Sequence, residues 1–381
     1  MKRSLYEETH DSFRESVRGF MARHVVPVHD SIIAERAIPR SVWKAAGEAG
    51  LLGLEVPEEY GGSEANDFRF NAVFLEELAK ESMAFASSFS IQGDIVAPYL
   101  VKLTSPEQRE RWLPGYVSGD ILGAIAMTEP AVGSDLANLS TRAVPDGDSW
   151  VINGSKTYIT NGLSADLVVV AAKTDRDAGA KGISMFAVEH GTEGFVRGKK
   201  LDKVGQPESD TAELFFEDVR VPKENLLGKL NHGFFHMMTF LPQERIAAAV
   251  ANLAHARQTF DETLAYAKDR VAFGQPIGSM QYNKFLLAEL ITELETAQAF
   301  VDAAVVQHAH RELSAVDAAK AKWWSAKVQN RVIDACVQLY GGAGYMNEIR
   351  AARAWKDARV TRIWAGSEEI MKEIIGRDLG L

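Results

Sequence analysis

Glu244 is the side chain in this sequence whose surroundings best suit acid–base chemistry. It stands in FHMMTFLPQERIAAAV, flanked by FLP and by IAAAV, which is an apolar setting for a helix that crosses a bundle. Pro242 lacks a backbone donor and disturbs the local helical hydrogen bonds. A carboxylate in such a place is partly desolvated, which raises its pKa and suits a general base. The competing interpretation is a glutamate on a helix exterior, where most glutamates lie.

Other residue types that carry chemistry give weaker signals. His232 and His236 are four residues apart and could share a helix face, but no third ligand clusters with them, so we predict no metal site. Cys336 is the single cysteine and lies in the run VIDACVQLY, which favours a small core residue over a nucleophile. The sequence also lacks a G-x-G-x-x-G between a strand and a helix, a P-loop, an H-E-x-x-H and a G-x-S-x-G.

Three further stretches carry a signal, although each also has a purely structural interpretation. AIAMTEPAVGSD (124–135) combines small residues with turn residues, and alone it is typical of a capped linker. KTYITNG (156–162) places two hydroxyls and an aromatic ring at a strand end, which also fits a hairpin exit. DRVAFGQPIGSMQ (269–281) joins two helical runs, and its Arg and Gly also fit an ordinary helix C-terminus.

The elements that must position these residues fall into three regions. We predict a helical domain over 1–119, a β domain over 120–230 and a helical bundle over 231–381. Strands without helices between them predict antiparallel pairing in a small barrel or sandwich, with a type I′ hairpin at Asn153-Gly154. Long helices with short links predict an antiparallel bundle. The helices expected in the last domain cover 233–269, 279–312, 315–340, 347–360 and 367–378.

Composition sets the class of protein. The chain has 381 residues, 46% hydrophobic and 25% charged, as is usual for a globular enzyme. Its formal net charge of −10 argues against nucleic-acid binding, which needs a basic face. One cysteine allows no intrachain disulfide, and we identify neither a secretory signal nor a membrane-spanning run, so we expect a cytoplasmic protein.

The separate motifs occur in a familiar order. VPEEYGG (56–62), SDTAELFFEDVRVPKENLLG (209–228) and KDARVTRIWAGSEEI (356–370) join the stretches above and QLYGGAGY. Together they resemble the acyl-CoA dehydrogenase family over essentially the whole chain. The resemblance implies a helical–β–helical fold that binds FAD without a Rossmann domain, between the β domain and the bundle. It also implies a homo-oligomer, a tetramer built as a dimer of dimers, that passes electrons to an electron-transferring flavoprotein.

The resemblance assigns cofactor contacts residue by residue. Thr128 would bond the flavin pyrimidine edge and Thr160 would lie near flavin N5, with Tyr158 where the family often has Trp. Arg270 and Phe273 would reach the pyrophosphate and adenine half of FAD in a neighbouring subunit, a role that suits the planar fork of arginine. The full set of implied FAD contacts is Ile125, Ala126, Met127, Thr128, Ser134, Tyr158, Ile159, Thr160, Arg270, Phe273, Gln281, Gln338, Leu339, Gly341, Gly342, Ser367 and Glu369.

The implied reaction is α,β-dehydrogenation of an acyl-CoA thioester to a trans-2-enoyl-CoA. Most of the family has its basic Glu at the position of Ala365, which cannot take a proton but keeps its backbone N–H for the thioester oxygen. The long-chain and isovaleryl-CoA branches place the base at the position of Glu244, and LPQER favours the long-chain branch. The implied substrate contacts are Ser134, Pro242, Gln243, Glu244, Arg245, Trp364, Ala365 and Gly366, with Phe85, Ile91, Val96 and Met237 as candidates for the acyl pocket.

Two alternatives remain open at this point. One is an enzyme like the acyl-CoA oxidases, in which oxygen reoxidises the flavin. The other is a catalytically inactive CoA- or FAD-binding subunit of a heteromer, which Ala365 favours and Glu244 opposes. Acyl chain length and branching depend on the depth of a pocket that the sequence does not define.

Overall fold

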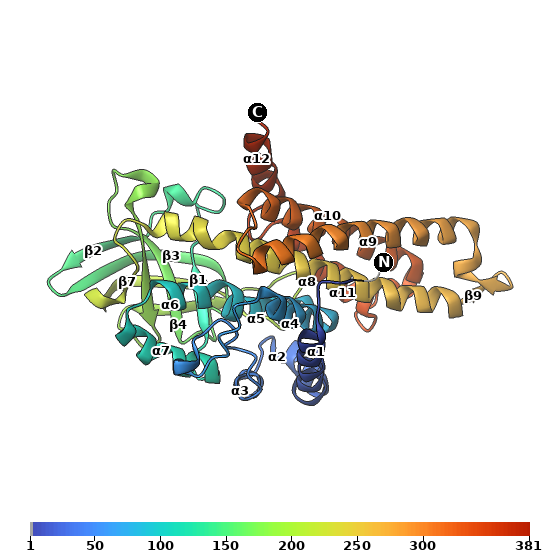
Figure 1. The fold of residues 1–381 in the computed structure, drawn as a ribbon, viewed down its shortest axis with the longest axis horizontal. Coiled ribbons are helices and arrows are strands. Elements are labelled where there is room, and N and C mark those ends of the chain that lie inside the picture. Colours follow the sequence, from blue (N-terminus) through green and yellow to red (C-terminus); the bar gives the residue numbers. More distant parts are fainter. Residues whose placement is uncertain (1–2) are drawn as a thin grey trace.

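The computed structural model describes residues 3–381 and has a helical part, a β part and a second helical part in chain order (Figure 1). This confirms the predicted fold class. The predicted boundaries after residues 119 and 230 lie in the short links between elements: one follows α7, which ends at Ser118, and the other precedes α8, which begins at Gly233. Among residues 3–381, no helix combines the length and the apolar composition that crossing a bilayer requires.

The first part is a layer of short helices. Local sequence signals start them: the Ser105 hydroxyl accepts a hydrogen bond from the Gln108 N–H at 3.3 Å, and Pro106 occupies the first turn of α7. Asp67 caps α4 in the same way, through the Arg69 N–H at 2.9 Å. The helices are α1 (Glu8–Phe20), α2 (His29–Glu35), α3 (Arg40–Glu48), α4 (Phe68–Glu81), α5 (Met83–Ser90), α6 (Ala97–Leu103) and α7 (Pro106–Ser118), with a π-helical turn η4 (Ile91–Val96) between α5 and α6.

The second part is one eight-stranded sheet with the order β6-β7-β3-β2-β4-β5-β8, and β1 pairs with β4 beside this path. Within the described chain the two outer strands of that order do not pair, so the sheet is open and not a closed barrel. The strands are β1 (Gly123–Ala126), β2 (Arg142–Asp146), β3 (Ser149–Thr160), β4 (Leu167–Lys173), β5 (Ile183–Glu189), β6 (Phe195–Lys200), β7 (Thr211–Pro222) and β8 (Leu226–Leu227).

Two details of the predicted β part are wrong. The sheet is mixed, because β4 runs parallel to both β1 and β2. The chain between β1 and β4 passes through a whole hairpin, which supplies the long crossover that a parallel pair needs. Asn153-Gly154 forms no hairpin: β3 continues through it with a bulge, and the turn lies at Gly147 instead. A Cβ at Gly154 would stand 2.4 Å from the Thr141 hydroxyl oxygen, so this glycine permits a close approach of two segments.

The third part is a bundle of long helices. The predicted helices over 233–269 and 315–340 match α8 and α10 in both bounds, and α8 continues through Pro242. The bounds are α8 (Gly233–Asp269), α9 (Gln281–Ala309), α10 (Ala315–Tyr340), α11 (Arg350–Ala358) and α12 (Glu368–Asp378), with a hairpin of β9 (Val271–Ala272) and β10 (Gln275–Pro276) between α8 and α9 and a 3₁₀ turn η9 (Gly341–Tyr345) after α10.

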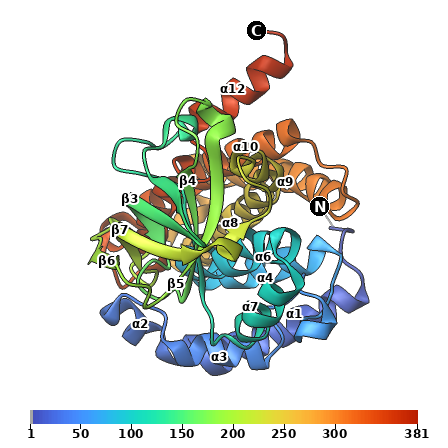
Figure 2. The same ribbon diagram turned by 90° about the vertical axis from the view of Figure 1, so that its left-hand side faces the viewer.

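Helix α8 is the central element of the molecule. It packs against α4 and α10, and buried residues of all three helices share one hydrophobic core. Figure 1 shows the sheet at one end of the molecule and the β9–β10 hairpin at the opposite end, and Figures 1 and 2 both show α12 projecting away from the bundle. Residues near the start of α8 therefore lie where the three parts meet, and residues at its end lie far from the sheet.

Candidate active site

A cavity of about 120 Å³ lies where the three parts meet. Helices α4, α5 and α8, the end of β3 and the turn before α12 contribute its walls, which are mostly Ala, Leu, Ile and Met side chains. The few polar groups are Ser87, Ser90, Thr160 and Glu244. An apolar cavity with few polar groups suits an acyl chain with one reactive end.

Glu244 is the only carboxylate among the described residues that line this cavity. Burial raises the pKa of its carboxyl above the usual value, while the charges of Arg245 and Lys322 act in the opposite direction. A carboxylate that is desolvated but still ionised is a stronger base than one in water. The predicted apolar setting of Glu244 on a bundle helix is therefore what the structure has.

The turn before α12 supplies another part of the cavity wall. Ala365 and Gly366 both have left-handed backbones, with φ of 52° and 90°. The left-handed region is unfavourable for alanine, so the surrounding contacts hold this conformation. The Ala365 N–H donates to no acceptor within residues 3–381, although the residue lines the cavity with Trp364. Ser367 follows as the N-cap of α12, accepting from the Ile370 N–H at 3.4 Å.

The residues on either side of Glu244 do not line the cavity. Gln243 points into a separate buried network, donating to the Glu55 carboxylate at 2.8 Å and to the Asp94 carbonyl at 3.1 Å. Arg245 is buried, and among residues 3–381 its Nε has no acceptor. A buried guanidinium with an unused donor suits a negatively charged or carbonyl ligand. Pro242 lies half-buried in the helix.

The segment after β1 is fixed against β3. The Thr157 N–H donates to the Thr128 carbonyl at 3.0 Å, and the Lys156 ammonium donates to the Met127 carbonyl at 3.0 Å and to Glu129 at 2.9 Å. Lys156 and Glu129 are both fully buried. This pair therefore holds 125–128 beside the strand end that reaches the cavity at Thr160.

Tyr158 has the conformation of a residue under constraint. Its φ is +59°, the β3–β7 pairing is irregular between Lys156 and Ile159, and 70% of the side chain is exposed. An exposed aromatic ring held in the left-handed region, two residues before Thr160, is suited to stacking on a planar ligand. Ile159 points the other way, into the core of the sheet, and Ser134 is exposed in the loop after β1.

A second group of predicted cofactor residues lies at the far end of the bundle. Arg270 follows α8, and Phe273 in the β9–β10 hairpin is 97% exposed with φ of +53°. Gln338 and Leu339 line a separate cavity of about 470 Å³ with residues at the start of α9. Figure 1 shows this hairpin and the sheet at opposite ends. A single copy of the chain therefore does not bring these residues close to the predicted flavin contacts at the sheet end of the molecule. The other members of this distant group are the exposed residues Gln281, Gly341 and Gly342.

Some of the residues predicted to form the acyl pocket line the cavity, and others do not. Ile91 and Trp364 line the cavity. Phe85, Val96 and Met237 instead belong to the hydrophobic cores and are not among its lining residues. Glu369 is exposed in the first turn of α12. Ile125 and Ala126 belong to β1, and Gly366 adjoins the cavity without lining it.

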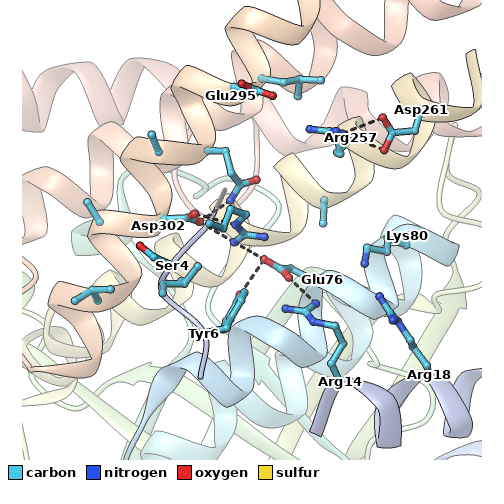
Figure 3. A pocket seen from close by; sticks show the side chains of 18 residues that line it. Ser4, Tyr6, Arg14, Arg18, Glu76, Lys80, Arg257, Asp261, Glu295 and Asp302 are labelled. Atoms are coloured by element: carbon cyan, nitrogen blue, oxygen red, sulfur yellow. Dashed lines mark hydrogen bonds and ion pairs between the residues drawn. The ribbon is translucent and has the colours of Figure 1, made fainter. Parts of the chain in front are cut away.

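Another cavity, of about 850 Å³, is a different kind of site (Figure 3). It lies between the N-terminal segment and helices α1, α4, α8 and α9, and charged side chains dominate it. These charges pair with one another: Arg3 lies 2.6 Å from Glu76 and 2.7 Å from Asp302, and Arg14 lies 2.7 Å from Glu76. Its paired charges are unsuited to an apolar acyl chain.

Sequence reasoning missed Lys322. It is fully buried on α10, and its ammonium donates to the Gly366 carbonyl at 2.5 Å. Burial lowers the pKa of Lys322 to about 8, although nearby carboxylates including Glu368 and Glu244 raise it. The signal was a lysine inside the run VDAAKAKWWSA, where helical spacing alone does not distinguish a core lysine from a surface one.

Comparison with known proteins agrees with this geometry. Three family models match: "Acyl-CoA dehydrogenase, N-terminal domain" over residues 7–120, the middle domain over 124–219 and the C-terminal domain over 231–380. The long-chain specific acyl-CoA dehydrogenase of Rattus norvegicus mitochondria is 44% identical over 379 residues, 99% of this chain and 88% of that protein.

Two solved structures extend the comparison. The acyl-CoA dehydrogenase of Geobacillus kaustophilus superposes with a TM-score of 0.98 at 43% identity, over the whole of both chains. A glutaryl-CoA dehydrogenase of Mycobacterium smegmatis, solved with FADH2, gives a TM-score of 0.92 at 27% identity, covering 98% of this chain and 95% of that one. The chain therefore belongs to the acyl-CoA dehydrogenase family of FAD-dependent oxidoreductases.

Proposed function

We propose that this protein dehydrogenates a fatty acyl-CoA to the trans-2-enoyl-CoA with Glu244 as the base. The observation that carries the proposal is one cavity lined by both Glu244 and Ala365. The first offers a desolvated carboxylate, and the second offers a backbone N–H with no acceptor in the described chain. The Glu244 carboxylate can accept the α-proton of a substrate, and the Ala365 N–H can donate to the thioester oxygen of the same substrate.

The residues then divide the work. Glu244 takes the α-proton, and the Ala365 N–H donates to the thioester oxygen, where negative charge develops. Apolar walls exclude water, which strengthens that hydrogen bond. Arg245, buried beside the base with an unused Nε donor, helps to hold the polar end of the substrate. FAD, when bound, supplies the acceptor for the hydride that leaves the β-carbon.

Two groups of this chain suit the two halves of FAD. Thr128, Tyr158 and Thr160 suit the flavin, because Thr160 lines the cavity that holds Glu244, Tyr158 lies two residues before it on β3, and the Thr128 carbonyl accepts from the Thr157 N–H of the same strand. Arg270 and Phe273, exposed at the other end of the bundle, suit the pyrophosphate and adenine. Since one chain separates these groups, we propose that a second copy completes each cofactor site, in a homotetramer (Figure 1).

The substrate we propose is a long-chain acyl-CoA, used in fatty acid β-oxidation. The LPQER string around Glu244 and the 44% identity to the rat long-chain enzyme support this choice. Electron-transferring flavoprotein is the proposed electron acceptor. We also propose a cytoplasmic location. Because the rat relative is a mitochondrial protein, cell fractionation is needed to test this location.

An anaerobic titration of the purified flavoprotein with acyl-CoAs of graded chain length tests the proposal. We expect the yellow flavin to bleach, with the highest kcat/KM for long straight chains. An absence of bleaching with every acyl-CoA would favour an inactive CoA- or FAD-binding subunit, the alternative that Ala365 raises. Reoxidation by oxygen as fast as by electron-transferring flavoprotein would instead indicate an oxidase.

A further inference from the structure

The segment that ends at Ala365 is held from one side by α10. Asn330 donates to the Ala358 carbonyl at 3.0 Å, and Gln329 accepts from the Thr361 hydroxyl at 2.7 Å. Lys322, seven residues before Gln329 and so on the same helix face, donates to the Gly366 carbonyl at 2.5 Å. Three polar side chains of α10 thus fix the backbone over 358–366, and Lys322 fixes its last turn.

The hydrogen bond from Lys322 is made to a turn whose backbone conformation is unfavourable. Ala365 and Gly366 are consecutive left-handed residues, and the first has a Cβ that disfavours this conformation. A buried ammonium group also needs acceptors, because desolvation of an unpaired charge is costly. The Gly366 carbonyl meets this need, so each partner stabilises the other.

The same helix is tied to the helix of the base. Asn252 on α8 donates to the Ser325 hydroxyl at 3.2 Å, and that hydroxyl donates to the Lys322 carbonyl at 3.1 Å. Lys322 therefore connects, within one network, the turn at Ala365 and the helix that carries Glu244. The charged groups that act on its ammonium are Glu368, Glu244, Arg245 and Glu369.

We infer that Lys322 is a positioning residue for the dehydrogenation. Its ammonium holds the Gly366 carbonyl, and this fixes the left-handed turn that presents the Ala365 N–H to the thioester oxygen. The inference rests on the proposed function, in which that N–H stabilises the negative charge developing on the substrate. Displacement of such a donor by about 1 Å is expected to cost roughly 10²-fold in rate.

The test uses acetoacetyl-CoA, whose acidic α-protons let the enolate form without oxidation. Its enolate absorbs in the ultraviolet, so the pH midpoint of enolate formation on the protein reports stabilisation of the thioester oxygen. The parent is holoenzyme with Glu244→Gln, which removes the carboxylate that would otherwise titrate beside the ligand. Lys322→Met in this background is expected to raise the midpoint by about two units, equivalent to the roughly 10²-fold rate loss above.

Three further variants make the result specific. Lys322→Arg keeps a charged donor and is expected to recover most of the shift. Lys320→Met is the matched control, because Lys320 lies on the same helix, is partly exposed and pairs only at the surface with Asp317. With Glu244 intact, Lys322→Met is expected to lower kcat about a hundredfold and to change KM little.

The outcomes separate the inference from the function on which it rests. A Glu244→Gln parent that fails to lower the midpoint below that of free acetoacetyl-CoA would overturn the role of the Ala365 N–H. A parent that lowers it, with the same midpoint in folded, flavin-containing Lys322→Met, would overturn only the role of Lys322. If the Met variant does not fold, Lys322→Gln replaces it, and an unchanged midpoint there has the same meaning.

Discussion

Glu244 on α8 and Ala365 before α12 line the same cavity, and of the two only Glu244 carries a side chain that can accept a proton. The two positions are far apart in the sequence, yet both line this cavity. The alanine is therefore compatible with the proposed function, in which the carboxylate comes from another helix. Its backbone N–H does not depend on the side chain that is missing.

Glu244→Gln is expected to keep FAD and lose catalysis. The amide has nearly the same shape as the carboxylate but cannot accept the proton. Flavin bleaching by acyl-CoA should therefore slow by roughly 10²- to 10⁴-fold. Anaerobic stopped-flow absorbance measures this rate. Asp261→Asn is the matched control, because Asp261 lies on the same helix in an exposed pair with Arg257. Bleaching by Glu244→Gln at nearly the wild-type rate would show that another group is the base.

The pH profile should show the environment of Glu244. Burial raises its pKa, and the base must be ionised, so kcat/KM should rise with pH through a midpoint above the ordinary glutamate value of about 4.3. Initial rates across the acid limb measure this midpoint, with a check that the protein stays folded at each pH. An acid limb centred on the ordinary value would contradict the desolvated setting.

The fold was accessible from the sequence because its signals are local. Helical periodicity predicted α8 and α10 to the residue. Pairing partners were not local, so the parallel neighbours of β4 were missed. Asn153-Gly154 has the preferred hairpin sequence, but here a glycine is required at 154 because Thr141 lies too close for a Cβ. No local sequence pattern contains that contact.

In the candidate site, too, residues with local sequence signals were predicted and residues that depend on tertiary contacts were not. Glu244 could be identified because its apolar neighbours are adjacent in sequence, and Thr160, Trp364 and Ala365 join it in the cavity. The family resemblance implied a substrate contact for Gln243, but in the structure its side chain donates to Glu55. Lys322 could not be found, because its partner is a backbone carbonyl that only the tertiary fold brings close.

The buried pair of Lys156 and Glu129 should be essential to the β part. Lys156→Met would leave the Glu129 carboxylate without its cation, and loss of one partner of a buried pair costs roughly 3–5 kcal/mol of unfolding free energy. Urea denaturation measures the loss, and flavin content should fall with it. Lys223→Met, in an exposed pair with Asp148, should change stability by less than about 0.5 kcal/mol.

A double variant sharpens that prediction. Lys156→Met with Glu129→Gln removes both charges. The amide oxygen can still accept from the Ser140 N–H, which now donates to one carboxylate oxygen, but the amide NH2 then faces the Thr141 N–H, which donates to the other. We expect the double variant to regain part of the lost stability. A double variant as unstable as Lys156→Met alone would mean that packing of the lysine stem, and not the unpaired charge, sets the cost.

His29 should make stability depend on alkaline pH. Its Nδ1 lies 2.7 Å from Glu81 and its Nε2 lies 2.8 Å from Glu208, so the imidazolium joins α2 to α4 and to the segment before β7. Burial alone would lower the pKa of His29, but the hydrogen bonds to Glu208 and Glu81 outweigh it and raise the pKa to about 9. The folded state therefore binds this proton more tightly than the unfolded chain does.

The sign of the effect follows from this linkage. The stabilisation is complete below the unfolded histidine pKa of about 6.5 and is lost as pH rises to about 9, a change on the order of 3 kcal/mol. His29→Gln should lower the melting temperature at pH 6 by several degrees and have a much smaller effect near pH 9.5, by roughly the same reasoning. Lys203 and Asp357 also have shifted pKa values nearby, so the difference between variant and wild type at each pH is the measurement. The exposed His190→Gln serves as the control, and a His29→Gln deficit that stays constant across this range would show that His29 acts by packing and not by charge.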